Sequence, residues 1–212
     1  MTYAEILAEI QLLSKRGDID DKIAACIRTT TLRAHRLDYF WRDRIEVAAT
    51  WATASNSTDI AITTLTRFRA IDYVRYYDPD TTPVTRGTMI EEVDPRVLLD
   101  DYNYEKTDVW YMAGTNIRLK FLTATRGVEI GYFSSPIVHP AGSYVSWIAD
   151  QLPDLIIQGS LAMLFNMTGK QEEARAINAM VGFDMVSQPN SAQKGPTLVE
   201  QLRAFALEAQ AR

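Results

Sequence analysis

The sequence predicts an α+β protein: a helical bundle, built from an N-terminal helix pair and a C-terminal helical hairpin, with an inserted antiparallel β-rich subdomain and an extended C-terminal tail. Apolar residues recur every three or four positions toward both ends of the chain, whereas the middle alternates aromatic and branched residues with polar ones. The chain has 212 residues, of which 47% are hydrophobic, so it can bury a sizeable core. We divide it into N-terminal helices (1–43), a β-rich insertion (44–138), a helical hairpin (139–188) and a tail (189–212).

Two helices are expected at the N-terminus. Thr2 and Glu5 have the spacing of a capping box, in which each side chain accepts a hydrogen bond from the backbone of the other residue. The apolar stripe that follows predicts a helix that ends at Gly17: Ile6, Leu7, Ile10 and Leu13.

The second helix is expected to run from a cap at Asp18 or Asp20 to about Leu37. Its predicted packing side is apolar and contains Ile19, Ile23, Cys26, Ile27 and Ala34.

Strands are expected to begin near Tyr39. Residues 54–58 are polar and suggest a turn, and residues 67–77 predict a long strand that Asp78-Pro79-Asp80 ends, because proline cannot donate to a β-ladder. Asp94-Pro95 has the pattern of a helix start and predicts a short helix to about Leu99.

The clearest hairpin joins residues 109–112 to residues 117–121 through a loop that contains glycine and asparagine. Residues 128–133 alternate like a further strand, and the prolines Pro136 and Pro140 then interrupt the sheet pattern.

The C-terminal hairpin begins at Leu152-Pro153-Asp154. Residues 155–165 are apolar on most sides, so this helix should be buried, and residues 168–170 turn the chain into a second helix that extends to about Ser187. The connecting loop is short, so the two helices should be antiparallel neighbours. A final amphipathic stretch follows residues 195–197, which are expected to cap it.

Composition narrows the classes of function. The net charge of −5 and the pI near 5.1 argue against a generally nucleic-acid-binding or membrane-binding surface. Cys26 is the single cysteine and the first residues lack a signal-peptide pattern, so we expect synthesis in a reducing cytoplasm. The longest apolar run, 155–165, is too short to span a bilayer.

Candidate reactive residues are few, and a structural role is expected for each. His35 and His139 lack the neighbours of a catalytic triad or a metal site, and Cys26 lies on an apolar stripe. The aspartates of 18–21 and 78–80 lack the rest of a calcium loop and fit capping or turn roles. The sequence therefore predicts a non-enzymatic protein without a cofactor or a metal.

Two further sequence patterns can be interpreted either as a binding surface or as ordinary structure. Residues 67–77 mix arginines with aromatic residues, as single-strand nucleic-acid-binding platforms do, but their alternation favours a half-buried strand. Acidic residues predominate in 90–110 and basic residues in 15–44, so unlike patches could pair between copies of the chain, or both could be solvated surface. The interface charges chosen on this basis are Arg28, Arg33, Arg36, Glu91, Glu92, Asp100 and Asp101.

The sequence resembles the head-to-tail adaptor proteins of short-tailed bacteriophages, of the tail tubular protein A type. The resemblance covers roughly residues 1–187. It rests on the start of the first helix, the long strand, the hairpin and the two C-terminal helices: residues 2–7, 68–75, 110–119, 152–162 and 170–174.

The resemblance implies a virion protein that forms a ring of twelve copies below the portal, receives the tail or nozzle protein, and lets DNA pass through its lumen without sequence-specific binding. In such proteins the C-terminal segment often reaches the portal. The candidate docking anchors in this sequence are Leu198, Leu202 and Phe205.

Two alternatives remain open at this stage. One is another phage neck or tail-completion protein that forms a different ring. The other is a small cell-wall glycan hydrolase that uses paired carboxylates such as Glu91 and Glu92, although adjacent residues on a strand point in opposite directions.

Overall fold

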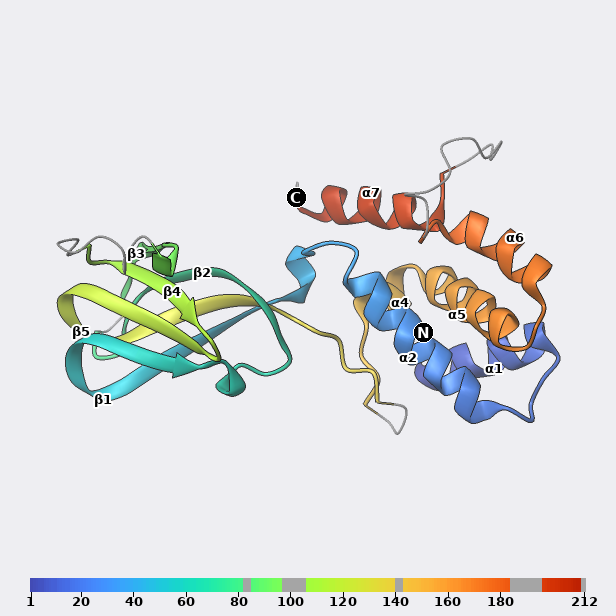
Figure 1. Ribbon diagram of the computed structural model, residues 1–212, viewed down its shortest axis with the longest axis horizontal. Coiled ribbons are helices and arrows are strands. Elements are labelled where there is room, and N and C mark those ends of the chain that lie inside the picture. The colour runs from blue at the N-terminus through green and yellow to red at the C-terminus, as the bar shows by residue number, and fades with distance from the viewer. Residues whose placement is uncertain (82–84, 97–105, 140–142, 184–195, 211–212) are drawn as a thin grey trace. The chain divides into compact units, whose positions relative to one another are not determined.

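A computed structural model of the protein describes residues 1–81, 85–96, 106–139, 143–183 and 196–210 (Figure 1). It confirms the α+β class: the described residues contain six α-helices and a five-stranded sheet. The chain divides into two compact units. The helical unit comprises 1–42 and 136–212, and the β unit comprises 43–135.

The first helix, α1 (Tyr3–Ser14), begins with the expected capping box. The Glu5 N–H donates to Thr2 Oγ1 over 3.3 Å, and the Thr2 N–H donates to Glu5 Oε2 over 2.8 Å. The expected end at Gly17 is wrong, because the chain leaves the helix at Lys15, which adopts a left-handed conformation with φ of 55°. The second helix, α2 (Asp20–His35), has its expected apolar residues on the packing side, but Ile19 occupies the cap position and makes no side-chain cap.

The helix α5 (Pro153–Met167) is the centre of the helical unit. It contacts α1 and α2, the short helix α4 (Trp147–Gln151), and the later helices α6 (Gln171–Val181) and α7 (Leu198–Gln210). Most of its side chains are buried, as its apolar composition predicts. Gly159 allows α2 to approach closely, because a Cβ at that position would lie 2.6 Å from Thr30 Cγ2.

Three features of the helical unit differ from expectation. The helix α4 was not expected, and α6 ends at Val181 rather than near Ser187, because Gly182 takes a left-handed C-cap conformation with φ of 81°. The tail expected to be extended contains the helix α7. Its start agrees with the sequence, since the Glu200 N–H donates to Thr197 Oγ1 over 3.2 Å.

The β unit consists of β1 (Arg44–Ala61), β2 (Phe68–Asp78), β3 (Thr85–Glu92), β4 (Val109–Ala113) and β5 (Asn116–Ser134), with a short 3-10 helix at Ile62–Thr64. Another 3-10 helix, Trp41–Asp43, spans the boundary between the two units. The strand order is β1-β5-β2-β3-β4, and β4 also pairs with β5, so the pairing returns to β5. All pairs are antiparallel except the short β3–β4 contact.

The predictions made from the sequence differ from the structure in three parts of this sheet. The turn expected at 54–58 lies inside β1, where the register with β5 shifts between Thr50 and Ser57. The strands expected at 117–121 and 128–133 are one continuous strand, β5. The strand β3 was not expected, and only residues 95–96 of the short helix after Asp94 are described as helical, since 97–105 lie outside the described residues.

The two units have separate cores. In the β unit, Val74, Ile90, Val128 and Ile130 are buried, and the Trp51 and Phe121 rings stack with centroids 5.9 Å apart. The helical core draws its buried residues from α1, α2, α4, α5, α6 and α7 and from the segment before the β unit. Within the described residues, no helix has the length and apolarity that crossing a bilayer requires.

Candidate assembly surfaces

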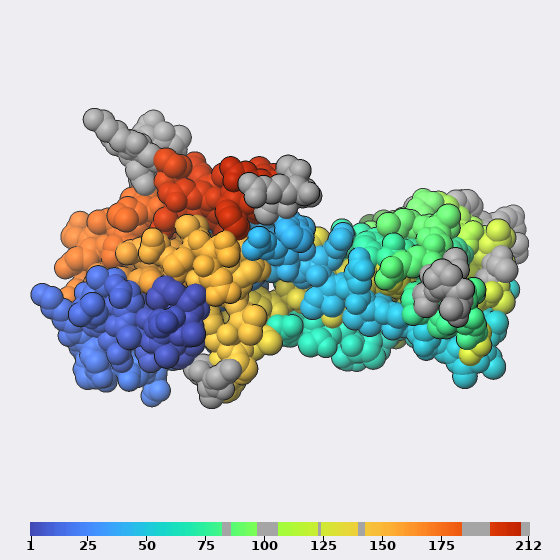
Figure 2. Space-filling view, turned by 180° about the vertical axis from the view of Figure 1, so that it is seen from behind, coloured from blue at the N-terminus to red at the C-terminus, as the bar shows by residue number. Residues whose placement is uncertain are grey.

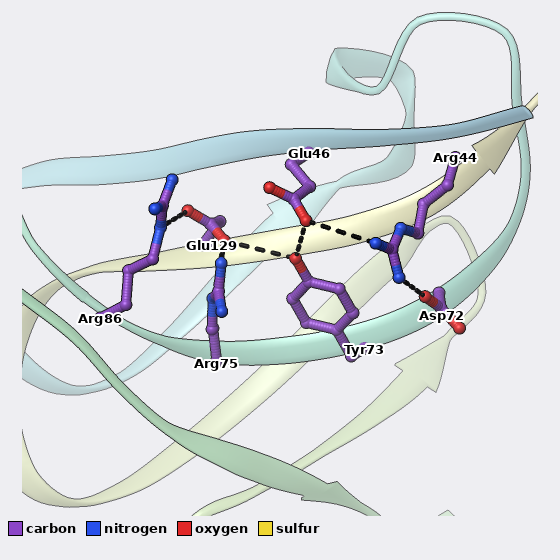
Figure 3. Close-up of polar contacts among 7 residues, drawn as sticks. All are labelled: Arg44, Glu46, Asp72, Tyr73, Arg75, Arg86 and Glu129. Atoms are coloured by element: carbon purple, nitrogen blue, oxygen red, sulfur yellow. Dashed lines mark hydrogen bonds and ion pairs between the residues drawn. The ribbon is translucent and has the colours of Figure 1, made fainter. Parts of the chain in front are cut away.

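Seven polar residues form a connected set on one face of the β unit (Figure 3). We call this set the Glu129 network. Strand register brings it together, because residues paired across strands share a face: Glu46 of β1 and Tyr73 of β2 both pair with Gly131 of β5, and Arg75 pairs with Glu129. Its members are Arg44, Glu46, Asp72, Tyr73, Arg75, Arg86 and Glu129.

Glu129 is the buried centre of the network, with only 4% of its side chain exposed. Arg75 donates to its Oε1 from Nε over 2.7 Å and also from Nη2, and Arg86 donates to Oε2 over 2.8 Å. The Tyr73 hydroxyl oxygen lies 3.3 Å from the same Oε1, although its proton is donated to the nearer Glu46. Both carboxylate oxygens are therefore occupied, and a buried anion is compensated by two guanidinium groups.

The pKa of Glu129 reflects two opposed effects. Burial alone would raise it, because a charged carboxylate is poorly solvated inside a protein. The hydrogen bonds and charges of Arg86 and Arg75 outweigh this effect and hold the pKa of Glu129 below its ordinary value. Glu129 is thus an ionised structural anchor rather than a proton donor at neutral pH.

Tyr73 connects Glu129 to the edge of the sheet. Its ring lies on Gly131, where a Cβ would meet the ring at 2.3 Å, so only glycine fits beneath it. The hydroxyl donates to Glu46 Oε1 over 2.5 Å. Burial, together with this carboxylate, raises the pKa of Tyr73 to about 12. Arg44 extends the network outward by pairing with Asp72 over 3.1 Å.

A second cluster attaches the C-terminal helix to the helical unit. The Arg42 guanidinium lies over three rings, those of Trp41, Trp147 and Phe205, at 5.6, 5.5 and 5.3 Å from their centroids. Phe205 belongs to α7, and the space-filling view shows α7 lying on the surface of the helical unit (Figure 2).

The three residues expected to anchor a partner therefore lie differently in the structure. Leu202 is completely buried in the helical core, Leu198 packs against that core, and Phe205 is half-buried beside Arg42. In this structure the apolar side of α7 is occupied by its own chain.

The predicted interface charges are exposed wherever the structure describes them. Arg28 and Arg33 are exposed on α2 and Arg36 is exposed at its C-cap, although Arg33 also lies 4.7 Å from the Phe183 ring centroid. Glu91 and Glu92 are exposed on β3, and Lys106 donates to Glu91 over 2.6 Å. Asp100 and Asp101 lie outside the described residues.

The cysteine and the two histidines considered as candidate reactive residues have contacts that fit a structural role. Cys26 is buried, which raises the pKa of its thiol, and its sulfur lies 3.7 Å from Met167 Sδ. His35 is buried and Nε2 lies 2.9 Å from Ser146 Oγ, whereas His139 is exposed.

The two aspartate clusters are engaged in ordinary contacts. Asp18 pairs with Arg16, and Asp80 pairs with Arg126. Across the described part of the chain, no three His, Cys, Asp or Glu side chains gather as metal ligands would.

Sequence reasoning did not identify the Glu129 network. A signal existed, because Arg44 and Glu46 alternate on one strand and Tyr73 and Arg75 on another, which places each pair on one face. Their partner Glu129 lies within an apolar run, and the pairing of β5 between β1 and β2 could not be deduced from the sequence.

The model of a family described as SU10 adaptor protein matches residues 1–195. No curated protein matches the chain significantly.

Proposed function

We propose a function on one premise: this chain belongs to the SU10 adaptor protein family, because the family model covers residues 1–195 of its 212 residues. It is accordingly an adaptor protein of a bacteriophage virion, associated with other head and tail proteins. The tail tubular protein A type of adaptor is the particular kind that we propose.

In this proposal the protein assembles into a ring of twelve copies between the portal and the tail or nozzle protein. DNA passes through the ring without sequence-specific binding. The helical unit forms the wall, because its central helix α5 is enclosed by five others and gives a rigid body with a continuous core. The β unit, with its own core and its charged outer face, is the part that meets the tail.

Neighbouring copies are held head to tail by unlike charges. The basic surface of α2 presents Arg28, Arg33 and Arg36, and the acidic surface around β3 presents Glu91 and Glu92. A head-to-tail contact uses two different patches on each copy and closes into a ring. Complementary charge speeds the encounter and fixes the orientation of the partners.

Docking to the portal uses the C-terminal region. Since Leu202 is buried in its own chain, it can contact a partner only if α7 leaves the helical unit. Leu207, which is 66% exposed, is a large apolar residue of α7 that a partner can reach without this change.

The proposal is tested by mixing the purified chain with the portal protein of the same virus and measuring the mass of the complex and its symmetry in particle images. A twelve-fold ring attached to the portal is expected. A chain that ignores the portal would contradict the adaptor role, and a different ring number would favour the neck or tail-completion alternative.

The head-to-tail contact has its own test, a charge reversal followed by a compensating reversal. Arg28→Glu with Arg36→Glu should reduce ring formation, and adding Glu91→Arg with Glu92→Arg should restore it in part. Arg175→Glu, at an exposed position on α6, is the matched control and should have no effect. Equal loss in the control would contradict the proposed contact.

A further inference from the structure

A pocket opens at the N-terminal end of α1, within the helical unit. It has a volume of about 580 Å³ and is lined by residues 1–5, residues 144–146 and Asp150. The rings of Tyr3 and Tyr144 lie beside each other in its wall, with centroids 5.8 Å apart. Val145 also lines the pocket and is 60% exposed. The pocket therefore leaves apolar surface open to solvent.

The polar part of this pocket is acidic. The carboxylates of Glu5 and Asp150 are among its lining groups, and no lysine or arginine is among them. Glu5 caps α1, and Asp150 pairs with the amino group of Met1 over 3.0 Å, but both carboxylates remain exposed. A partner that fits the pocket therefore combines apolar side chains with a basic one.

The opposite end of α1 carries this combination. Leu12 is 71% exposed. Leu13 ends the apolar stripe that the sequence predicts for this helix, yet it is 44% exposed. Lys15, the C-cap residue, is also exposed, and its side chain makes no ion pair with any residue that the structure describes. The last turn of α1 thus presents two leucines and an unengaged lysine to solvent.

The leucines and the pocket cannot meet within one molecule. They lie at opposite ends of α1, a helix of 12 residues that is roughly 18 Å long. A chain that carries an apolar projection and a separate pocket of complementary charge can join a second copy through these two unlike patches. The occupant that the chemistry of the pocket favours is therefore another copy of this chain.

Such a contact supplies what exposed charges alone do not. Ion pairs at a surface contribute little to stability, and complementary charge chiefly speeds and orients an encounter. Burial of apolar surface is the dominant favourable contribution in most protein associations. The charges proposed to join neighbouring copies therefore need an apolar contact beside them.

We propose that the last turn of α1 docks into the pocket at the start of α1 in a second copy. Leu12 enters the pocket beside Val145, and Lys15 approaches Asp150. The contact uses two different patches on each copy, so it repeats from copy to copy. The inference rests on the proposed ring and identifies an apolar contact between its neighbouring copies.

Mixing two variants tests whether these patches meet. Leu12→Glu removes the projection and leaves the pocket intact, whereas Val145→Asp damages the pocket and leaves the projection intact. Each variant alone should remain near the 23.9 kDa of the chain in light scattering. An equimolar mixture should form a dimer of about 48 kDa, because one intact projection meets one intact pocket. A mixture that remains monomeric at concentrations where the natural chain associates would overturn the proposal.

The matched control is Met180→Glu. Met180 is another exposed apolar residue of the helical unit, 52% exposed on α6, and its replacement should leave association unchanged. All three variants should keep the Tm of the natural chain, because each replaced side chain is exposed. Equal loss of association in Met180→Glu would show that added charge acts without regard to position, which contradicts the contact.

Exchange of charges tests the approach of Lys15 to Asp150. Lys15→Glu or Asp150→Lys alone should raise the Kd of association about tenfold, and the double variant should return it to within about threefold of the original. Asp150→Lys also breaks the pair with the Met1 amino group, and the double variant does not restore that pair. Recovery therefore supports the contact between copies, and a double variant as weak as the single ones contradicts it.

Addition of the portal protein separates this contact from the adaptor role. Leu12→Glu should lower the number of copies held per portal, measured from the mass of the complex. If the portal holds equal numbers of both chains, and the natural chain alone stays monomeric at every concentration, the α1 contact is refuted and the adaptor role stands. If no chain joins the portal but the mixed variants form the dimer, the α1 contact stands and the adaptor role fails.

Discussion

Glu129 holds the outer face of the β unit together, and its replacement is the first prediction. Glu129→Gln keeps the size of the side chain but removes the charge that Arg75 and Arg86 share. We expect a loss of about 2 kcal/mol in the free energy of unfolding, measured with urea, because a partly buried guanidinium loses its counter-ion. Glu46→Gln is the control, since Glu46 is exposed and should cost less than half as much.

The Glu129 carboxylate should also make the stability of the folded state sensitive to acid. The folded pKa of Glu129 lies below its ordinary value of 4.5, so the folded state binds fewer protons than the unfolded state. Its contribution is present above about pH 4.5 and is lost as the pH falls through the folded pKa. Urea unfolding between pH 7 and pH 3 should therefore show a smaller decline for Glu129→Gln than for the natural chain, and identical slopes would contradict this account.

Tyr73 should make the folded state less stable at alkaline pH, whereas Glu129 does so at acid pH. Its pKa rises from 10.0 to about 12 on folding, so its contribution is complete below pH 10 and is lost as the pH rises toward 12. Tyr73→Phe should reduce the alkaline decline in stability while lowering stability at pH 7. Absorbance titration of the phenolate measures the shift directly. Part of the decline should remain, since burial and Asp108 also raise the pKa of Tyr76.

The stability of the β unit should depend on the small size of Gly131. Gly131→Ala places a Cβ into the Tyr73 ring and should cost about 2 kcal/mol, a typical penalty for overpacking. Tyr73→Ser removes the ring, so adding Gly131→Ala to it should cost little. A double-mutant cycle without this coupling would show that the ring does not lie on Gly131.

At the scale of elements, the packing of α7 yields a prediction about local opening. Leu202→Ala should release α7, because Leu202 is fully buried, whereas Leu207→Ala should not. Hydrogen exchange of α7 amides reports the release, and roughly tenfold or more loss of protection is expected for Leu202→Ala alone. Equal exchange in the two variants would contradict the attachment of α7 to the helical core.

Elements with strong local signals were predictable from sequence. The capping box at Thr2, the hairpin turn at Gly114 and the buried helix α5 each depend on neighbouring residues. The misjudged elements depend on distant partners. The polar stretch near Ser55 remains strand because β5 pairs with β1 on both sides of it, and β3 is a strand because β2 lies beside it.

Among the candidate surfaces, too, the features that depend on distant residues could not be predicted from the sequence. Arg28, Arg36, Glu91 and Glu92 are exposed, and their role as interface charges remains a prediction. The Glu129 network could not be assembled from sequence, since its members come from β1, β2, β3 and β5. The burial of Leu202 was also missed, because an amphipathic helix does not reveal which surface covers its apolar side.

At the scale of the whole molecule, the two units should unfold separately. The helical core and the core of the β unit share no residue. Calorimetry should resolve two transitions, and Glu129→Gln should lower the midpoint of only one. A fragment of residues 43–135 should retain the near-ultraviolet signal of the stacked Trp51 and Phe121. A single transition that Glu129→Gln shifts as a whole would contradict this independence.

The beginning and the end of the β unit lie next to each other, since Arg44 pairs with Phe133 and Ser134 Oγ donates to the Asp43 carbonyl oxygen over 3.3 Å. A segment whose two ends meet can be exchanged for another of different length or sequence while the rest of the chain keeps its connectivity. Neighbouring ends are the arrangement in which the insertion of one segment into another is tolerated. Relatives of this protein should therefore diverge fastest between these two positions.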